Sequence, residues 1–147
     1  MAGYLAGLVT KTNFVSTVGG QKIPPVDHYI AGFQAGAKAA NPKVTTLNAY
    51  SQSFTDQAAC KQLALNQISQ HSDVVFQVAG GCGLGALSAA KEKTVWGVGV
   101  DADQAYLGPF LLTSAVQPVD VPVFTTVKET PAGALQVAPH PLFPRPS

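Results

Sequence analysis

Apolar positions along the chain alternate between short continuous runs and longer stretches with helical spacing. The continuous runs predict five β-strands, at about residues 13–18, 44–49, 73–78, 95–100 and 111–116. The helical stretches lie at the N-terminus, up to Lys11, and at about residues 26–40, 56–71, 84–91 and 119–130. The pattern therefore predicts a regular alternation of strands and helices.

The predicted strands are apolar on both faces, and the run 73–78 is interrupted within the strand only by Gln77. Strands buried on both faces are typical of a parallel sheet that helices cover on each side. Crossovers between parallel strands are right-handed, which restricts the winding. The predicted fold class is α/β, with an open, mostly parallel five-stranded sheet in the order 2-1-3-4-5 and helices on both faces.

Two ends of the chain carry special patterns. In the first helix, Tyr4, Leu5, Leu8 and Val9 share helical spacing and are expected to form its packing face. At the other end, five prolines fall within the seventeen residues 131–147. Because proline removes a backbone donor and fixes φ, we expect this tail to be extended and largely disordered. The predicted organisation is one domain over 1–130 and a tail over 131–147.

Composition excludes several classes of protein. Charged residues make up 12% and the net charge is +1, which argues against charge-driven disorder and a nucleic-acid-binding surface. No apolar run approaches the roughly 20 residues that span a bilayer. The apolar N-terminus lacks the basic region and the cleavage site of a signal peptide. Two cysteines are too few for a disulfide scaffold or a structural zinc site.

The carboxyl ends of the predicted strands gather most of the unusual residues of the chain. In an open parallel sheet the ligand crevice lies outside these ends. The segments that follow the strands are rich in glycine, polar and aromatic residues, and comprise residues 19–20, 50–56, 79–83, 101–104 and 114–117. This convergence predicts a small-molecule site at one edge of the sheet.

Each part of this edge has more than one interpretation. The glycines of 80–85 precede a helix, but they do not fit G-x-G-x-x-G; backbone N–H groups that bind a polar ligand group are a better interpretation than an NAD site. Asp101 and Asp103 suit sugar hydroxyls better than a metal, for which a third ligand is missing, although they could equally be solvated. Tyr50 and Phe54 suit stacking on a flat ligand, or simple core packing.

Catalytic signals are weak. No serine or cysteine lies in a G-x-S-x-G turn, and His28, His71 and His140 are expected to be solvated. Cys82 at a helix start would have a lowered pKa, but without a histidine partner it is interpreted as a ligand contact. We therefore predict no enzyme, no cofactor and no metal.

Several motifs in series resemble one known family. They are residues 2–7 (AGYLAG), 18–26 (VGGQKIPPV), 32–37 (GFQAGA), 53–56 (SFTD), 73–85 (DVVFQVAGGCGLG), 89–93 (AAKEK), 99–104 (GVDADQ) and 112–116 (LTSAV). Their order and spacing are similar to those of the basic membrane protein family, the substrate-binding lipoproteins of ABC transporters that include purine nucleoside receptors. The resemblance extends over about residues 2–128.

This resemblance implies one lobe of a type I periplasmic binding protein, with a nucleoside-like ligand and an ABC permease as partner. It places Tyr50 or Phe54 near the base, Asp101 and Asp103 on the ribose side, and the glycine loop at the cleft floor. The implied ligand-binding residues are Tyr50, Phe54, Gly80, Gly81, Cys82, Gly83, Asp101, Asp103 and Gln117. Gln117 stands where the family usually has lysine, which puts one charged contact in doubt.

Relative to the family, the chain starts at the AGYLAG helix and ends in the proline-rich segment. We expect a C-terminal lobe alone, truncated or a fragment, whose incomplete cleft binds nucleosides no tighter than about 1 mM. We also expect the first helix to pack poorly and the chain to associate with itself or with the missing lobe. The family implies a periplasmic or membrane-associated location, whereas the chain as given would remain cytoplasmic. The alternatives are a flavodoxin-like or dinucleotide-binding enzyme domain, or a degenerate lobe that only contacts a partner.

Overall fold

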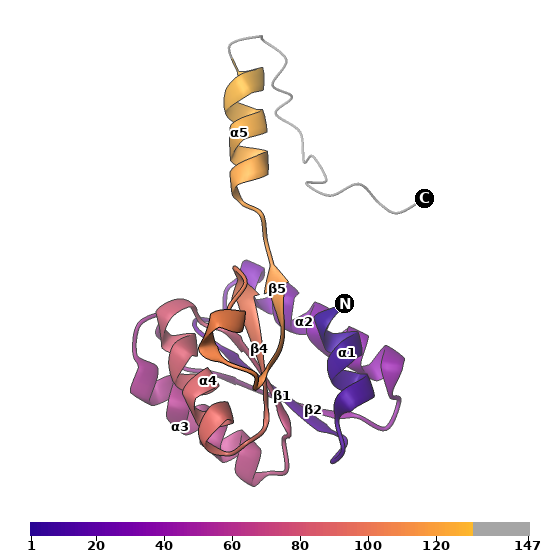
Figure 1. Ribbon diagram of the computed structural model, residues 1–147. Helices are drawn as coiled ribbons and strands as arrows, with labels where there is room; N and C mark the ends of the chain where they lie inside the picture. The colour runs from indigo at the N-terminus through magenta and orange to yellow at the C-terminus, as the bar shows by residue number, and fades with distance from the viewer. Residues whose placement is uncertain (131–147) are drawn as a thin grey trace. The chain divides into compact units, whose positions relative to one another are not determined.

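Five β-strands form the sheet of a computed structural model that describes residues 1–130. They are β1 (Phe14–Gly19), β2 (Thr45–Tyr50), β3 (Val74–Val78), β4 (Trp96–Asp101) and β5 (Leu111–Val116). Their order is β2-β1-β3-β4-β5, and all four neighbouring pairs are parallel (Figure 1). Every strand begins and ends within one residue of its predicted bounds, so the predicted sheet and its order are confirmed.

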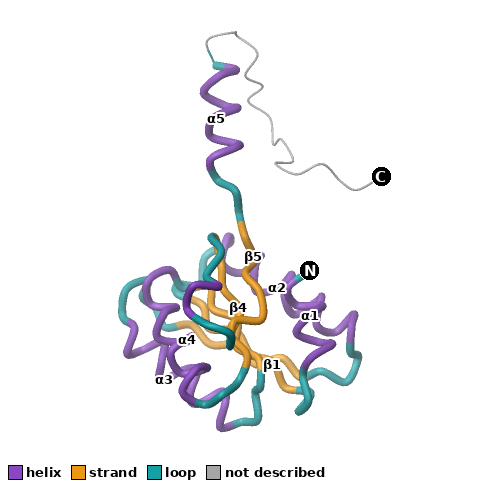
Figure 2. The backbone as a smooth tube through the Cα atoms, in the orientation of Figure 1, coloured by secondary structure: helices purple, strands orange, loops and turns teal. Residues whose placement is uncertain are grey.

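Helices cover both faces of this sheet. The α-helices are α1 (Ala2–Val9), α2 (Pro24–Ala40), α3 (Gln57–Ser69), α4 (Gly83–Glu92) and α5 (Asp120–Glu129), and two short 3₁₀ helices are η1 (Gly80–Cys82) and η2 (Ala105–Leu107). Figure 1 shows α1 and α2 on one side of the sheet and α3 and α4 on the other, and Figure 2 shows the strands between these two layers. The expected α/β class is therefore confirmed.

Local sequence explains where two of these helices begin. Pro24 and Pro25 open α2, where the missing N–H costs nothing because the first helical amides have no partner in the helix. Asp56 is the N-cap of α3, and its carboxylate accepts a hydrogen bond from the Ala59 amide at 3.0 Å.

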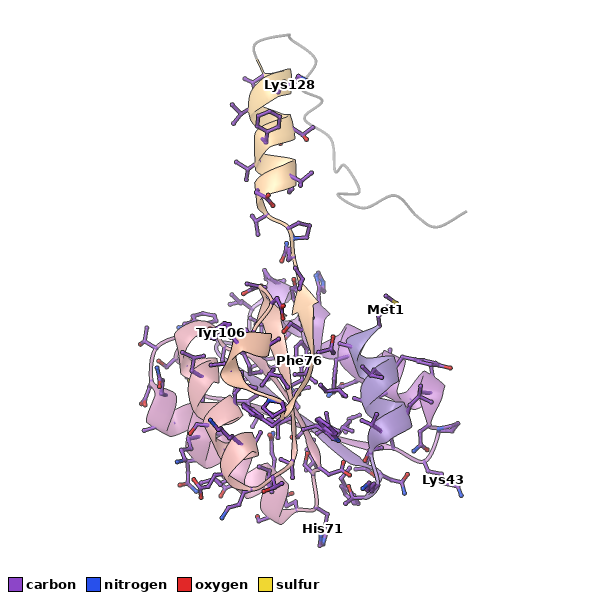
Figure 3. The ribbon with its side chains drawn as sticks, in the orientation of Figure 1. Met1, Lys43, His71, Phe76, Tyr106 and Lys128 are labelled. Atoms are coloured by element: carbon purple, nitrogen blue, oxygen red, sulfur yellow. A yellow bond between two sulfur atoms is a disulfide. The ribbon has the colours of Figure 1, made fainter. Side chains whose placement is uncertain are left out.

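The two faces of the sheet have different cores. On the side of α2, the rings of Phe33 and Phe76 stack with their centroids 4.8 Å apart. Figure 3 shows Phe76 in the interior between the helical layers, and full burial of such a ring contributes about 1.5–3 kcal/mol. On the side of α3 and α4 the core contains many small residues, among them Ala64 and Ala86, which let the two helices lie close together.

The packing face of α1 differs from the prediction. Its buried residues are Gly3, Ala6 and Gly7, whereas Tyr4 is 49% and Leu8 60% exposed. A Cβ at Gly3 would overlap the backbone of Phe33, so the small residues allow α1 to lie directly on α2. The expected poor packing of α1 is therefore wrong for its inner face. Self-association of the chain stays a prediction.

The chain divides into two compact units, Met1–Val116 and Gln117–Ser147. The first holds the sheet with α1 to α4. The second contains α5, which confirms the helix expected over 119–130 with Pro122 in its first turn. The predicted proline-rich tail, 131–147, and with it the boundary after residue 130, lies outside the described residues. No helix within 1–130 is both long and apolar enough to cross a membrane.

Candidate functional site

The carboxyl ends of the strands lie at one edge of the sheet because all of them run in the same direction. At this edge β1 continues into α2 on one face, while β3 continues through η1 into α4 on the other. Such a point, where neighbouring strands send their helices to opposite faces, is where open α/β sheets bind ligands. The candidate site is built from the segments after β1, β2, β3 and β4.

The glycines at the end of β1, Gly19 and Gly20, make room for two aromatic rings. A Cβ at Gly20 would overlap the ring of Phe54, and a Cβ at Gly19 would lie only 2.7 Å from the ring of Tyr50. Both rings are partly buried and pack against the core on the side of α2. The structure thus brings Tyr50 and Phe54 to the same end of β1, as the sequence predicted, and gives both of them a packing role.

The loop after β3 is fastened to the loop after β2. The Cys82 amide donates a hydrogen bond to the Phe54 carbonyl at 2.9 Å. Gly80 has φ +56°, a conformation that favours glycine, while Gly80 and Gly81 are exposed and present backbone alone. A ligand at this edge would therefore meet peptide groups next to the Phe54 segment.

Cys82 does not have the environment that the sequence suggested. Its sulfur is bonded to that of Cys60 in α3, the Cα atoms lie 5.6 Å apart, and both residues are fully buried. No thiol remains to titrate. The expectation of a ligand contact by the Cys82 side chain is therefore corrected: this side chain fixes the loop from beneath.

Gly83 also supports the loop from below. It is buried, and a Cβ there would overlap the side-chain oxygen of Gln77. Gln77 itself is 1% exposed, and its Nε2 donates to Gln104 Oε1 at 2.8 Å. The sequence identified Gln77 as the one amide within an apolar strand, but did not predict this contact with the segment after β4.

Two residues of α2 that sequence reasoning missed contribute to the edge. The Tyr50 hydroxyl donates to Asp27 Oδ1 at 2.5 Å. This hydrogen bond to a carboxylate raises the pKa of Tyr50, since it favours the protonated phenol; burial adds to the rise, and a hydrogen bond with Asn48 opposes it. Burial raises the pKa of Tyr29, and the negative charge of Asp101 adds to it. The signal in the sequence that could have identified Asp27 and Tyr29 is their position in the first turns of the helix that follows the β1 loop.

The two acidic residues after β4 have different surroundings. Asp101 is exposed, has φ +65° and lies close enough to Tyr29 to affect its titration. Asp103 is exposed too, but its Oδ1 accepts a hydrogen bond at 3.0 Å from the amide of Ala105, the first residue of η2. Asp101 is consequently the carboxylate with the better geometry for a ligand hydroxyl.

The remaining candidates lie elsewhere or have no defined place at the edge. Gln117 belongs to the second unit. His71 precedes β3, at the opposite edge of the sheet (Figure 3), where its ring contacts Phe14. His140 lies outside the described residues. Within residues 1–130, no three His, Cys, Asp or Glu side chains gather as a metal site would require.

The arrangement can recognise a ligand that has a flat face and hydroxyl groups. An aromatic edge, exposed peptide groups and a carboxylate lie on adjacent loops, and such convergence of a few polar groups is typical of small-molecule sites. The fold is that of an α/β lobe whose sheet carries these groups at one edge.

Comparison with known proteins identifies the family. Residues 1–136 match the family described as ABC transporter substrate-binding protein PnrA-like, and the chain belongs to it. A CD4+ T-cell-stimulating antigen of Listeria innocua is 37% identical over 150 residues, which cover 90% of this chain and 42% of the relative. The ABC transporter nucleoside-binding protein BmpA of Lactococcus lactis is 36% identical over 118 residues, which cover 75% and 34%.

Solved structures share the fold. A solute-binding protein of an ABC transporter system from Aeropyrum pernix matches with a TM-score of 0.77 and 24% identity, over 90% of this chain and 42% of that one. A transcriptional activator of the comK gene from Bacillus halodurans matches with the same TM-score and 27% identity, over 92% and 48%. The chain thus spans less than half the length of these relatives.

Proposed function

We propose that this chain contributes a binding surface for a nucleoside-like ligand within an ABC transporter substrate-binding protein. The proposal rests on Phe54, the exposed backbone of Gly80 and Gly81, and the carboxylate of Asp101, which lie in the segments at the carboxyl ends of β2, β3 and β4. The Phe54 carbonyl accepts a hydrogen bond from the loop after β3, and β4 is the next strand beyond β3. Membership of a substrate-binding family supports it, and one relative is named as a nucleoside-binding protein.

Phe54 is the proposed platform for the base. Its ring packs directly on the backbone of Gly20, which has no side chain. Stacking on an aromatic ring suits every base because each base has a π face. Tyr50 is held by Asp27 and would border the base rather than move onto it.

Asp101 is the proposed partner of the sugar hydroxyls, because an ionised carboxylate accepts hydrogen bonds from two neighbouring hydroxyls. Asp103 would act beside it, at the cost of its hydrogen bond to the Ala105 amide. Gly80 and Gly81 would offer backbone groups, with Cys82 and Gly83 beneath them as support.

The proposed role is transport, with an ABC permease as partner and no catalytic step. The disulfide between Cys60 and Cys82 supports a location outside the reducing cytoplasm, periplasmic or at the cell surface, because such bonds persist in oxidising compartments.

Calorimetry of the full chain with adenosine, ribose and NAD tests the proposal. Adenosine should bind, and ribose should bind more weakly because it lacks the stacking base. Tighter binding of NAD than of adenosine would favour a dinucleotide site, and absence of adenosine binding would overturn the proposal.

The variant Asp101→Asn assigns the site. Asparagine tolerates the positive φ of this position, so the change removes charge without backbone strain. Adenosine affinity should fall about tenfold, the typical value of a hydrogen bond to a charged group. Glu92→Gln is the matched control. Glu92 is an exposed carboxylate at the end of α4 that pairs with Lys61 of α3, and this variant should bind like the parent.

A further inference from the structure

Two glutamine side chains join the ends of β3 and β4 beneath the candidate site. Gln77 Nε2 donates to Gln104 Oε1 at 2.8 Å, and Gln77 Oε1 accepts from the Ala79 amide at 3.2 Å. Gln77 therefore contacts, with its two ends, the loop that follows its own strand and the loop that follows β4. We call this pair of side chains the amide bridge.

The amide bridge extends to β5 through Gln104. Its Oε1 also accepts from the Val100 amide at 3.1 Å, and its backbone amide donates to Ser114 Oγ at 3.0 Å. Residues of three adjacent strands thus form hydrogen bonds with Gln104, two through its side chain and one through its backbone amide. A chain of hydrogen bonds within a protein interior is fixed more firmly than any of its members alone.

The bridge lies where the regular pairing of the strands stops. The register of β3 with β4 runs from Val74 and Trp96 to Phe76 and Val98, whereas β4 stays paired with β5 as far as Asp101 and Val116. Beyond Val98, side-chain amides connect β3 and β4 in place of the ladder. The glutamine side chains therefore provide a direct connection between the two loops at the carboxyl edge.

The side chains of the amide bridge are closely packed against two glycines. A Cβ at Gly83 would overlap Gln77 Oε1, and a Cβ at Gly99 would lie 2.7 Å from Gln104 Oε1 and 2.6 Å from Ser114 Oγ. Two glycines thus provide the space that the amides occupy. Because Gln77 is 1% exposed, its side-chain amide cannot form a hydrogen bond with water if Gln104 is removed as its partner.

We propose that Gln77 and Gln104 are positioning residues for ligand binding, which fix the Asp101 loop relative to the loop of Gly80 and Gly81. The proposal rests on the proposed function, since these two loops carry the carboxylate and the exposed backbone. Supporting contacts of this kind hold a binding group within the tolerance that recognition needs. Loss of the bridge leaves the Asp101 carboxylate unchanged in chemistry, but it shifts this carboxylate relative to the loop of Gly80 and Gly81.

The test compares three glutamine-to-methionine variants of the full chain. Gln77→Met and Gln104→Met each break the bridge with little change of volume. Gln67→Met is the matched control: Gln67 in α3 is 4% exposed and donates from Nε2 to the Thr17 carbonyl at 2.9 Å, within β1 and away from the edge. Gln104→Glu keeps an acceptor for both the Val100 amide and Gln77 Nε2.

The first measurement needs no ligand. Backbone amide resonances of Asp101, Ala102 and Gly81 should shift in both bridge variants, although neither substitution is at those positions, and stay in place in Gln67→Met. Gln104→Glu should return them toward the parent spectrum. Unchanged resonances in Gln77→Met and Gln104→Met, or equal changes in Gln67→Met, would overturn the proposal. Should Gln77→Met not fold, the half-buried Gln104 carries the comparison with its own Glu variant.

The second measurement is adenosine affinity. It should fall at least fivefold in the two bridge variants and remain within twofold of the parent in Gln67→Met, even where melting temperatures drop alike. Equal losses of affinity in Gln77→Met, Gln104→Met and Gln67→Met would mean that the bridge contributes to stability alone, and would overturn its positioning role. If the parent chain binds no adenosine, the proposed function fails, while the ligand-free spectra still decide whether the bridge positions the loops.

Discussion

Tyr50 and Asp27 show how one contact joins the end of β2 to the first turn of α2. The carboxylate stabilises the protonated phenol, so the pKa of Tyr50 is raised. A raised pKa in the folded state means that the contribution to stability is complete below the ordinary tyrosine value of about 10 and is lost as the pH rises through the folded value.

The variant Asp27→Asn should lower the pKa of Tyr50 toward that ordinary value, because the neutral amide no longer favours the protonated phenol. An alkaline titration followed by tyrosinate absorbance measures the change, with Tyr50→Phe as the control that assigns the transition. An Asp27→Asn titration curve identical to that of the parent would contradict the contact.

At the scale of elements, small residues decide where helices meet. α1 lies on α2 through Gly3 and Gly7, and α3 meets α4 through alanines and Gly85, at which a Cβ would overlap the backbone of Gln57. The larger residues Tyr4 and Leu8 of α1 lie outside this contact and remain exposed.

Gly3→Ala should therefore destabilise the fold by about 1–3 kcal/mol, the usual cost of overpacking. Gly32→Ala is the matched control, since Gly32 also lies in a helix but a Cβ there would meet nothing within 4 Å. It should stabilise α2 by about 0.5–1 kcal/mol. Urea unfolding compares the two, and equal effects would show that α1 does not lie on α2 in this way.

The disulfide acts between elements as well, since it joins α3 to the loop before α4 across a sequence separation of 22. Closing a loop of this length contributes about 3 kcal/mol. Replacing both Cys60 and Cys82 by alanine should lower the free energy of unfolding by about that amount. A thiol assay of the parent protein, denatured without a reductant, checks the bond itself. Detection of two reactive thiols would contradict the disulfide.

Which of these features the sequence could predict depends on how local their signals are. The strands and their order follow from apolar runs such as 73–78 and from the handedness of crossovers, both of which depend on neighbours along the chain. The disulfide and the packing face of α1 depend on contacts between helices, which the local pattern does not encode. For α1, hydrophobic periodicity predicted that Tyr4 and Leu8 form the packing face, whereas Gly3 and Gly7 form it. Gln77 was visible as an exception, but its partner Gln104 is a neighbour only in the folded sheet.

At the scale of the whole molecule, the described sheet presents one edge on which aromatic, backbone and acidic groups converge. The chain spans about two fifths of the length of the Listeria innocua relative. Adenosine bound at this edge should place its base against Phe54 and its ribose near Asp101. The Phe54 segment is hydrogen-bonded to the loop after β3, and the amide bridge joins the end of β3 to the segment after β4.

Intermolecular nuclear Overhauser effects between adenosine and the isotope-labelled full chain test this arrangement most directly. We predict contacts from the base protons to the Phe54 ring, together with ligand-induced shifts of the amides of Gly81 and Asp101. Contacts confined to the opposite edge, around His71 and Phe14, would contradict the account.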